Sequence, residues 1–453
     1  MKELKIINAR IPDYEESSWE IADILIDDGK IIKIGNVTED TIETIDANGD
    51  IASPGFIDIH AHEDPVSSGE FAHYTANRGL AMGVTTQVVG NCGDNADDIS
   101  SFCRDLNSGG PLNYVMLVGQ NYLRRMVGAD DVYKASTHDQ LEKMKMLLRN
   151  TKQFSPAGLS CGFEYSPGVT TEETIELAKA FDDEGYLISV HFRNDGAKSV
   201  DSIYEMAEIS KETGYAVQMS HIGSCSAVGY MDKSLEAIHN ARENGIDIMC
   251  DCYPYTAFCT GIGTAVFDDG CFEKWGKTYS DIEITDGPYK YQRCTKELFE
   301  KLRKENPEMN VIAYMLNDDE IKKAFEDPYV MIGSDCGFVN GTGHPRGAGT
   351  FPRVLGRYAR EEKVITVLEA LRKMTIMPAD RVHLNNKGDM KEGYDADIVI
   401  FNESIIIDRA EYQNPTLPPS GINYVIIDGK IAVRNGSIIN NRLGRYIPYQ
   451  NEF

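Results

Sequence analysis

Six side chains of metal-binding type follow directly on short apolar runs of the sequence. They are His60, His62, Cys92, His191, His221 and Asp335. The runs before them, such as GFIDI, GVTTQVV and YAVQM, have the composition of buried β-strands. Taken singly, a histidine, cysteine or aspartate in such a place is more often structural than functional. Five strand ends that all carry a metal ligand are better explained by one shared metal site, which the sequence therefore predicts.

The spacing of His60 and His62 suits the binding of one divalent ion. Alternate residues of a strand share a face and lie about 6.6 Å apart, at ~3.3 Å per residue, so we expect both imidazoles to point inward with Asp58. Imidazole and thiolate ligands favour zinc over magnesium or calcium. A neighbouring cation would keep Cys92 as a thiolate, which has enough lone pairs to bridge two ions.

The elements that would position these side chains alternate along the middle of the chain. Apolar strands there are followed by amphipathic stretches such as THDQLEKMKMLLRN and TTEETIELAKAFDDEG. This alternation over about 300 residues is typical of parallel α/β structure, most simply a (β/α)8 barrel. The C-terminal ends of barrel strands open onto one face, where active sites lie. Ligands far apart in the sequence are therefore expected to converge.

The two ends of the chain have a different pattern. Short β-branched runs such as LKIINARI and YVIIDGK meet at Asp-Gly or Asn-Gly turns of the hairpin type. We expect residues 1–54 and 385–453 to form a small β-sandwich domain beside a barrel at 55–384. Residues from about 258 to 312 break the alternation. We interpret them as an insertion at the barrel mouth that shapes the substrate pocket, and an unrecognised strand–helix unit of the barrel is the alternative.

Charge and composition limit the partners. The chain has 453 residues, with 71 acidic and 45 basic side chains and a formal net charge of -26. Nucleic acid and anionic membranes repel such a chain, so we expect a small-molecule substrate instead, with the oligomeric state open. We find no signal-peptide core and no apolar stretch of membrane-spanning length, which predicts a cytoplasmic protein. The ten scattered cysteines, without a CxxC pair, are expected to be mostly reduced.

Taken in order, these motifs resemble the amidohydrolase superfamily and, within it, the N-acyl-D-amino-acid deacylases (D-aminoacylases). The resemblance covers essentially the whole chain and includes PGFIDIHAHED, GNCG, GLSCGFEYSPG, VHFRNDG and MSHIG. Its most specific features are a cysteine where many relatives have a carboxylated lysine, and the block HPRGAGTFPRVLGRYAR. It implies zinc-dependent hydrolysis of the amide bond of N-acyl-D-amino acids, which gives a carboxylate and a free D-amino acid.

The resemblance also implies how the metal is held. A tightly bound zinc would take Cys92, His191 and His221. A second, weaker site would use four residues: His60, His62, Cys92 and Asp335.

The resemblance implies roles in substrate binding too. Arg346 of the HPR motif and Tyr165 would bind the substrate carboxylate, for which a planar guanidinium is well shaped. We expect Asp335 to act as general base and then as general acid. One position departs from the family pattern: Gly223 stands where relatives commonly have a lysine that faces this carboxylate. The preferred side chain and acyl group therefore stay open.

Two other functions fit parts of the same pattern. A cyclic amide hydrolase, such as a hydantoinase or dihydroorotase, would share the barrel and the HxH motif, but those relatives bridge their metals with a carboxylated lysine. A non-catalytic relative would keep the barrel and show gaps in the ligand set. The ligand set here has none.

Overall fold

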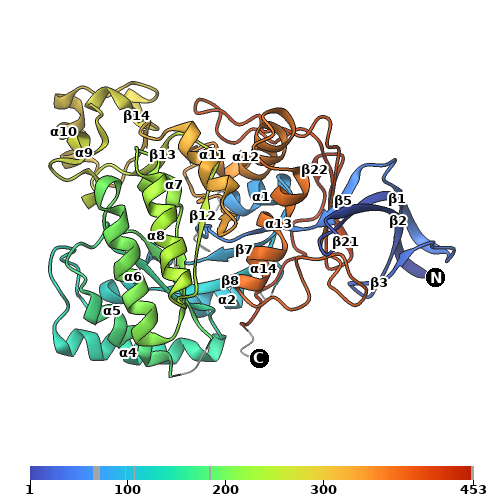
Figure 1. The fold of residues 1–453 in the computed structure, drawn as a ribbon, viewed down its shortest axis with the longest axis horizontal. Coiled ribbons are helices and arrows are strands. Elements are labelled where there is room, and N and C mark those ends of the chain that lie inside the picture. Colours follow the sequence, from blue (N-terminus) through green and yellow to red (C-terminus); the bar gives the residue numbers. More distant parts are fainter. Residues whose placement is uncertain (65–71, 97, 107, 183–184, 450–453) are drawn as a thin grey trace.

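Eight parallel strands form a barrel at the centre of the computed structural model, which describes residues 1–64, 72–96, 98–106, 108–182 and 185–449 (Figure 1). Around the barrel the strands are β6 (Phe56–Asp58), β7 (Val84–Val89), β8 (Asn113–Gly119), β9 (Gly158–Gly162), β10 (Leu187–His191), β11 (Ala216–Met219), β12 (Ile248–Cys252) and β16 (Val330–Ile332). A parallel bridge between Ala61 and Cys336 joins the first strand segment to the last. Most of these strand residues are buried, because helices cover the outer face of the barrel and side chains fill the inside.

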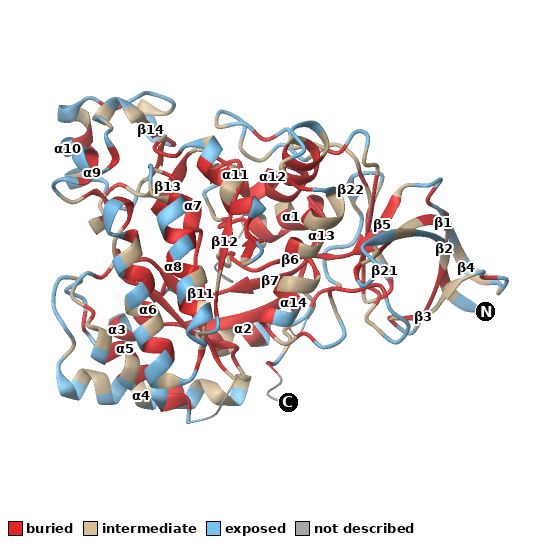
Figure 2. Cartoon of the chain, viewed as in Figure 1, coloured by how far each residue is buried: buried red, intermediate tan, exposed pale blue. Residues whose placement is uncertain are grey.

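Amphipathic helices surround the barrel. They include α4 (His138–Thr151), α5 (Thr171–Ala178), α6 (Ser199–Thr213), α8 (Met231–Glu243), α11 (Asp318–Glu326) and α13 (Val367–Met374). Their inward faces are buried and their outward faces exposed, as Figure 2 shows. The start of α4 is fixed by a capping box, in which Thr137 and Gln140 satisfy each other's backbone N–H groups. The predicted strand–helix alternation is thus the barrel itself.

Both chain ends contribute to a second, mostly antiparallel sheet of nine strands, at the right of Figure 1. It comprises β1 (Lys2–Asp13), β2 (Ser18–Asp27), β3 (Lys30–Gly35), β4 (Thr41–Asp46), β5 (Ile51–Pro54), β19 (Ile398–Phe401), β20 (Ile422–Ile427), β21 (Lys430–Arg434) and β22 (Ser437–Ile438). The two halves meet where β5 pairs with β19, with Ile51 opposite Phe401. The predicted fold class, a (β/α)8 barrel with a smaller β-domain from both termini, is confirmed.

The segment interpreted as an insertion forms a small sheet outside the barrel. Its strands are β13 (Phe258–Gly261), β14 (Ile282–Ile284) and β15 (Asn310–Ala313), accompanied by α9 (Cys271–Trp275) and α10 (Lys296–Glu305). Aromatic contacts among Phe267, Trp275 and Phe299 form its core. It lies at the upper left of Figure 1, at the end of the barrel away from the terminal sheet.

We propose domain boundaries on this basis: 1–54 and 385–453 for the β-domain, 55–384 for the barrel, and 258–312 for the insertion. Among the described helices, none combines the length and the apolar composition needed to span a membrane.

Candidate metal centre

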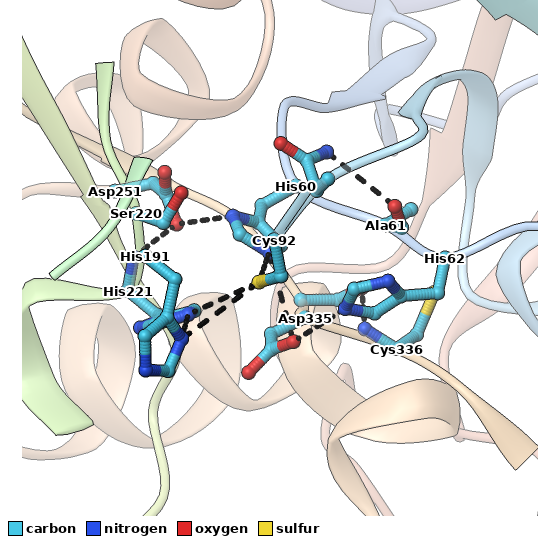
Figure 3. A network of polar contacts seen from close by, with 12 residues as sticks. His60, Ala61, His62, Cys92, His191, Ser220, His221, Asp251, Asp335 and Cys336 are labelled. Atoms are coloured by element: carbon cyan, nitrogen blue, oxygen red, sulfur yellow. Dashed lines mark hydrogen bonds and ion pairs between the residues drawn. The ribbon is translucent and has the colours of Figure 1, made fainter. Parts of the chain in front are cut away.

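Four buried side chains converge at the C-terminal mouth of the barrel, where Figure 3 shows them facing one another. The ligand atoms of His60, Cys92, His221 and Asp335 all lie within 4.8 Å of one another. The Cys92 Sγ atom is central, at 3.4 Å from His60 Nε2 and 3.5 Å from His221 Nε2. Each residue follows the end of a different barrel strand, namely β6, β7, β11 and β16.

The two remaining predicted ligands flank this cluster. Nδ1 of His191 lies 3.0 Å from His221 Nε2 and 3.9 Å from Cys92 Sγ. On the other side, Nε2 of His62 lies 3.1 Å from a carboxylate oxygen of Asp335. The structure therefore brings together all six residues that the sequence singled out.

Three of the candidate ligands have a backbone conformation that non-glycine residues rarely adopt. Cys92, His221 and Asp335 have φ values of 54°, 34° and 50°, in the left-handed region. Such a residue is strained by about 1–3 kcal/mol and persists only where its surroundings fix it. In each case the strand has ended two or three residues earlier, and the turn directs the side chain into the mouth.

The electrostatics of the cluster suit a cation. Burial alone would raise the pKa of the Cys92 thiol, but the charges of His60 and His221 lower that pKa well below its usual value. Burial would likewise raise the pKa of Asp335, but the Arg346 guanidinium beside it holds that pKa below its usual range. A thiolate, a carboxylate and several imidazoles in one buried site form a ligand set that fits zinc.

Outer residues that the sequence analysis missed hold the ligands in place. The Asp251 carboxylate of β12 lies 3.5 Å from His60 Nδ1 and accepts the backbone N–H of His221 at 2.8 Å. The Glu164 carboxylate lies 3.2 Å from His191 Nε2, and the Ser224 hydroxyl lies 2.7 Å from His221 Nδ1. Such partners fix the ring orientation and tautomer of metal-binding histidines. Asp251 and Glu164 also lie at strand ends, a signal that could have identified them.

Arg346, at the start of α12 (Arg346–Arg353), lies beside the cluster. Its Nη1 atom is 2.8 Å from Asp335 Oδ2, and its guanidinium stacks over the Tyr253 ring at 4.7 Å. Among the described residues, neither Arg346 Nε nor the Tyr253 hydroxyl has a hydrogen-bond partner, although both are buried. Buried unpaired donors of this kind are suited to a bound anion.

Tyr165 lines a pocket beside the cluster. The pocket is lined by Tyr165, His191, His221, Ser224, Thr260 and Asp335, among others. The Tyr165 ring lies 4.5 Å from the His191 ring, and its hydroxyl accepts a hydrogen bond of 3.2 Å from Thr260 of the insertion. The insertion therefore contributes to the pocket wall.

The structure gives a physical reason for Gly223. A Cβ atom at this position would lie 2.9 Å from the Cys252 sulfur, closer than side-chain carbons approach such an atom. The lysine of the family pattern would require Cys252 to move.

Comparison with known proteins identifies the family. Residues 51–432 match the amidohydrolase family. The chain belongs to this family. The D-aminoacylase of Alcaligenes xylosoxydans xylosoxydans is 27% identical to this amidohydrolase over an alignment of 481 residues. The alignment covers 98% of this chain and 97% of the relative. The N-acyl-D-glutamate deacylase of the same organism is 29% identical over 443 residues, 90% of this chain and 89% of the relative.

A solved structure supports the same relationship. It is that of the N-acyl-D-glutamate deacylase from Bordetella bronchiseptica, complexed with zinc and a phosphonate inhibitor. The structures superpose with a TM-score of 0.87 at 28% identity, over 98% of this amidohydrolase and 99% of the other chain. The resemblance to the N-acyl-D-amino-acid deacylases predicted from the motifs is confirmed, and the protein is an enzyme.

Proposed function

We propose that this amidohydrolase hydrolyses the amide bond of N-acyl-D-amino acids and releases a carboxylate and a free D-amino acid. The observation that carries the proposal is the ion pair between Asp335 and Arg346, 2.8 Å apart at the edge of the ligand cluster. In the mechanism that we propose, the general base and the cation that binds the substrate carboxylate would therefore be neighbours. The similarity to a D-aminoacylase and to N-acyl-D-glutamate deacylases supports the same assignment.

We propose zinc as the metal. Cys92, His191 and His221 would hold one ion tightly, and a weaker second site would use His60 and His62 with Cys92 and Asp335. When bound, zinc polarises the amide carbonyl and acidifies the attacking water.

Asp335 would move the proton. Its carboxylate is buried and its lowered pKa keeps it ionised, so it would accept a proton from the attacking water and return it to the leaving nitrogen. In the free enzyme the Arg346 guanidinium lowers its basicity. A substrate carboxylate that binds Arg346 would share this positive charge, and Asp335 would become a stronger base once substrate is in place.

Arg346 and Tyr165 would orient the substrate. Arg346 begins α12 and Tyr165 follows β9, so a substrate carboxylate that binds both side chains would have a fixed direction. With the carboxylate and the scissile amide both held, the α-hydrogen and the side chain can exchange places only by changing enantiomer. This restriction would let the site select one enantiomer, and the similarity to D-aminoacylase and N-acyl-D-glutamate deacylases supports the D form.

We also propose a cytoplasmic location and a small-molecule substrate. All ten cysteines are free, and most are buried, as is typical of proteins in reducing compartments.

The test is a screen of the zinc-loaded enzyme with N-acetyl and N-formyl D- and L-amino acids, and with D-hydantoins. We expect kcat/KM for the D-enantiomers to exceed that for the L-enantiomers by about a hundredfold or more, a difference of at least ~2.7 kcal/mol in transition-state binding. Turnover of hydantoins without turnover of N-acyl-D-amino acids would reject the proposal in favour of the cyclic amide hydrolase.

A further inference from the structure

One short helix of the insertion makes ionic contact with the surroundings of a metal ligand. Lys274 of α9 places its Nζ atom 3.1 Å from Glu164 Oε1, and it forms a second ion pair with Asp195. The neighbouring Trp275 donates its indole N–H to the other oxygen of Asp195, at 2.7 Å. The far oxygen of Glu164 faces His191 Nε2 at 3.2 Å. A continuous polar chain thus runs from the insertion to the metal ligand His191.

Because the two carboxylates are buried, this series of polar contacts depends on Lys274. The Glu164 and Asp195 side chains are 10% and 4% exposed, whereas the Lys274 side chain reaches the rim and is 31% exposed. Within the part of the chain that the structure describes, Lys274 is the one lysine or arginine that forms an ion pair with either carboxylate. Without it, two like charges would remain buried together with no cation beside them, and their repulsion would move the Glu164 carboxylate away from its place against His191.

The orientation of His191 depends in turn on Glu164. A carboxylate that accepts the Nε2–H of an imidazole leaves the lone pair on Nδ1. In His191 it is Nδ1 that faces Cys92 and His221, at 3.9 and 3.0 Å. If Glu164 were lost as an acceptor, the ring could rotate or change its tautomer, and its ligand atom would no longer point at the cluster.

We propose that Lys274 is a positioning residue of the metal centre, through which insertion helix α9 holds Glu164 against His191 and so sets the metal affinity. Asp195 completes the arrangement. It lies in the loop that follows β10, four residues beyond His191, and Lys274 and Trp275 also hold that loop through it. The proposal concerns metal binding alone and does not depend on which amide is hydrolysed.

The test measures zinc affinity of the full chain by competition with a chromophoric chelator, after the metal has been removed. Lys274→Met should weaken zinc binding by about 10- to 100-fold, the range found for partners of metal ligands. Lys274→Arg keeps the charge and should restore most of the affinity. The matched control is Lys277→Met in the same segment, since Lys277 forms no ion pair among the described residues and should bind zinc as the unmodified protein does.

A double-mutant cycle separates positioning from a general loss of structure. With Glu164 replaced by Gln, which has nearly the same shape, Lys274→Met should weaken zinc binding much less than it does in the unmodified protein, because only the part of its effect that passes through Asp195 remains. Glu164→Gln alone also keeps the test open if Lys274→Met does not fold, and it should lower the affinity similarly. An unchanged zinc affinity in Lys274→Met, or losses that simply add in the double variant, would overturn the proposal.

Discussion

The backbone N–H of Asp335 donates a hydrogen bond of 2.8 Å to the carbonyl of His60. Two residues further along, the N–H of His62 bonds the carbonyl of Cys336 at 3.0 Å. The first and last strand segments of the barrel are therefore joined at the candidate ligands themselves. The seam that closes the barrel and the site that would bind metal are the same few residues.

Metal removal should loosen this seam. A ligand present at about a thousandfold excess over its Kd stabilises the folded state by about 4 kcal/mol, so the chelated protein should melt at a lower temperature. Amide hydrogen exchange should quicken at Asp335 and His62, while amides in the middle of α4, such as that of Met144, should change little. Equal protection at the seam with and without metal would contradict this coupling.

Replacing Cys92 by alanine should abolish tight zinc retention and activity together. Its sulfur is the central atom of the cluster, and no other described residue offers a thiolate there. We expect kcat/KM to fall by about a thousandfold or more, equivalent to ~4 kcal/mol. Metal analysis after dialysis provides the second measurement. Cys103→Ala on α2 (Ile99–Leu106) is the control and should keep both metal and activity; a fully active, zinc-free Cys92→Ala enzyme would refute the assignment.

Arg346→Met should mainly impair substrates with a free α-carboxylate. The variant loses the guanidinium expected to bind that group, so kcat/KM for an N-acetyl-D-amino acid should fall by about 100-fold or more, the loss of a charge-assisted bidentate contact. The comparison substrate is the corresponding amide without a carboxylate. An equal loss on that amide would mean that Arg346 acts through Asp335, its ion-pair partner, and not on the substrate.

Asp335→Asn separates catalysis from tight metal binding. Asparagine tolerates a left-handed backbone well, so the turn at φ 50° should persist. The variant should keep zinc on Cys92, His191 and His221 but lose about 10²- to 10⁴-fold in kcat, as expected for removal of a general base. Loss of the tightly held zinc in this variant would place Asp335 in the tight site.

The pH dependence of stability should show the burial of Asp195. Burial and the nearby Glu164 charge raise the pKa of Asp195 from 3.8 to about 6. Between these values the unfolded chain gives up this proton and the folded protein keeps it, so the contribution of Asp195 to stability falls as the pH rises. The difference in urea midpoint between the wild type and Asp195→Asn should therefore decrease as the pH rises from about 4 to 6. At higher pH it should stay constant. An increase of this difference with pH would mean that the charge of Lys274 outweighs burial and lowers the pKa of Asp195 instead.

The convergence of the candidate ligands was predictable because barrel topology makes the ends of its strands neighbours. An apolar run followed by a residue of metal-binding type is enough to identify His60, His62 and Cys92 in the sequence. The parallel barrel then brings these residues together. The terminal sheet was predictable for a similar reason, since its hairpins are marked by Asp-Gly and Asn-Gly turns. Each of these signals lies within a short stretch of the sequence, and the fold then brings the stretches together.

The supporting contacts were not predictable in this way. Lys274 lies 110 residues from Glu164 and 79 from Asp195, and only the folding of the insertion over the mouth brings them together. The pairing of Arg346 with Asp335 likewise depends on where α12 begins in space. The left-handed backbone at Cys92 and His221 has no sequence signature, because it is imposed by the surroundings against the residues' own preference.

The three left-handed turns also bear on how this enzyme could evolve or be redesigned. Glycine adopts such turns freely, so substitution of Cys92, His221 or Asp335 by glycine would relieve about 1 kcal/mol or more of backbone strain at each position. The sequence lacks this gain in stability because it keeps candidate ligands at the three positions. Selection for thermal stability alone, in the absence of metal, would therefore replace these candidate ligands first, while the barrel fold would be retained.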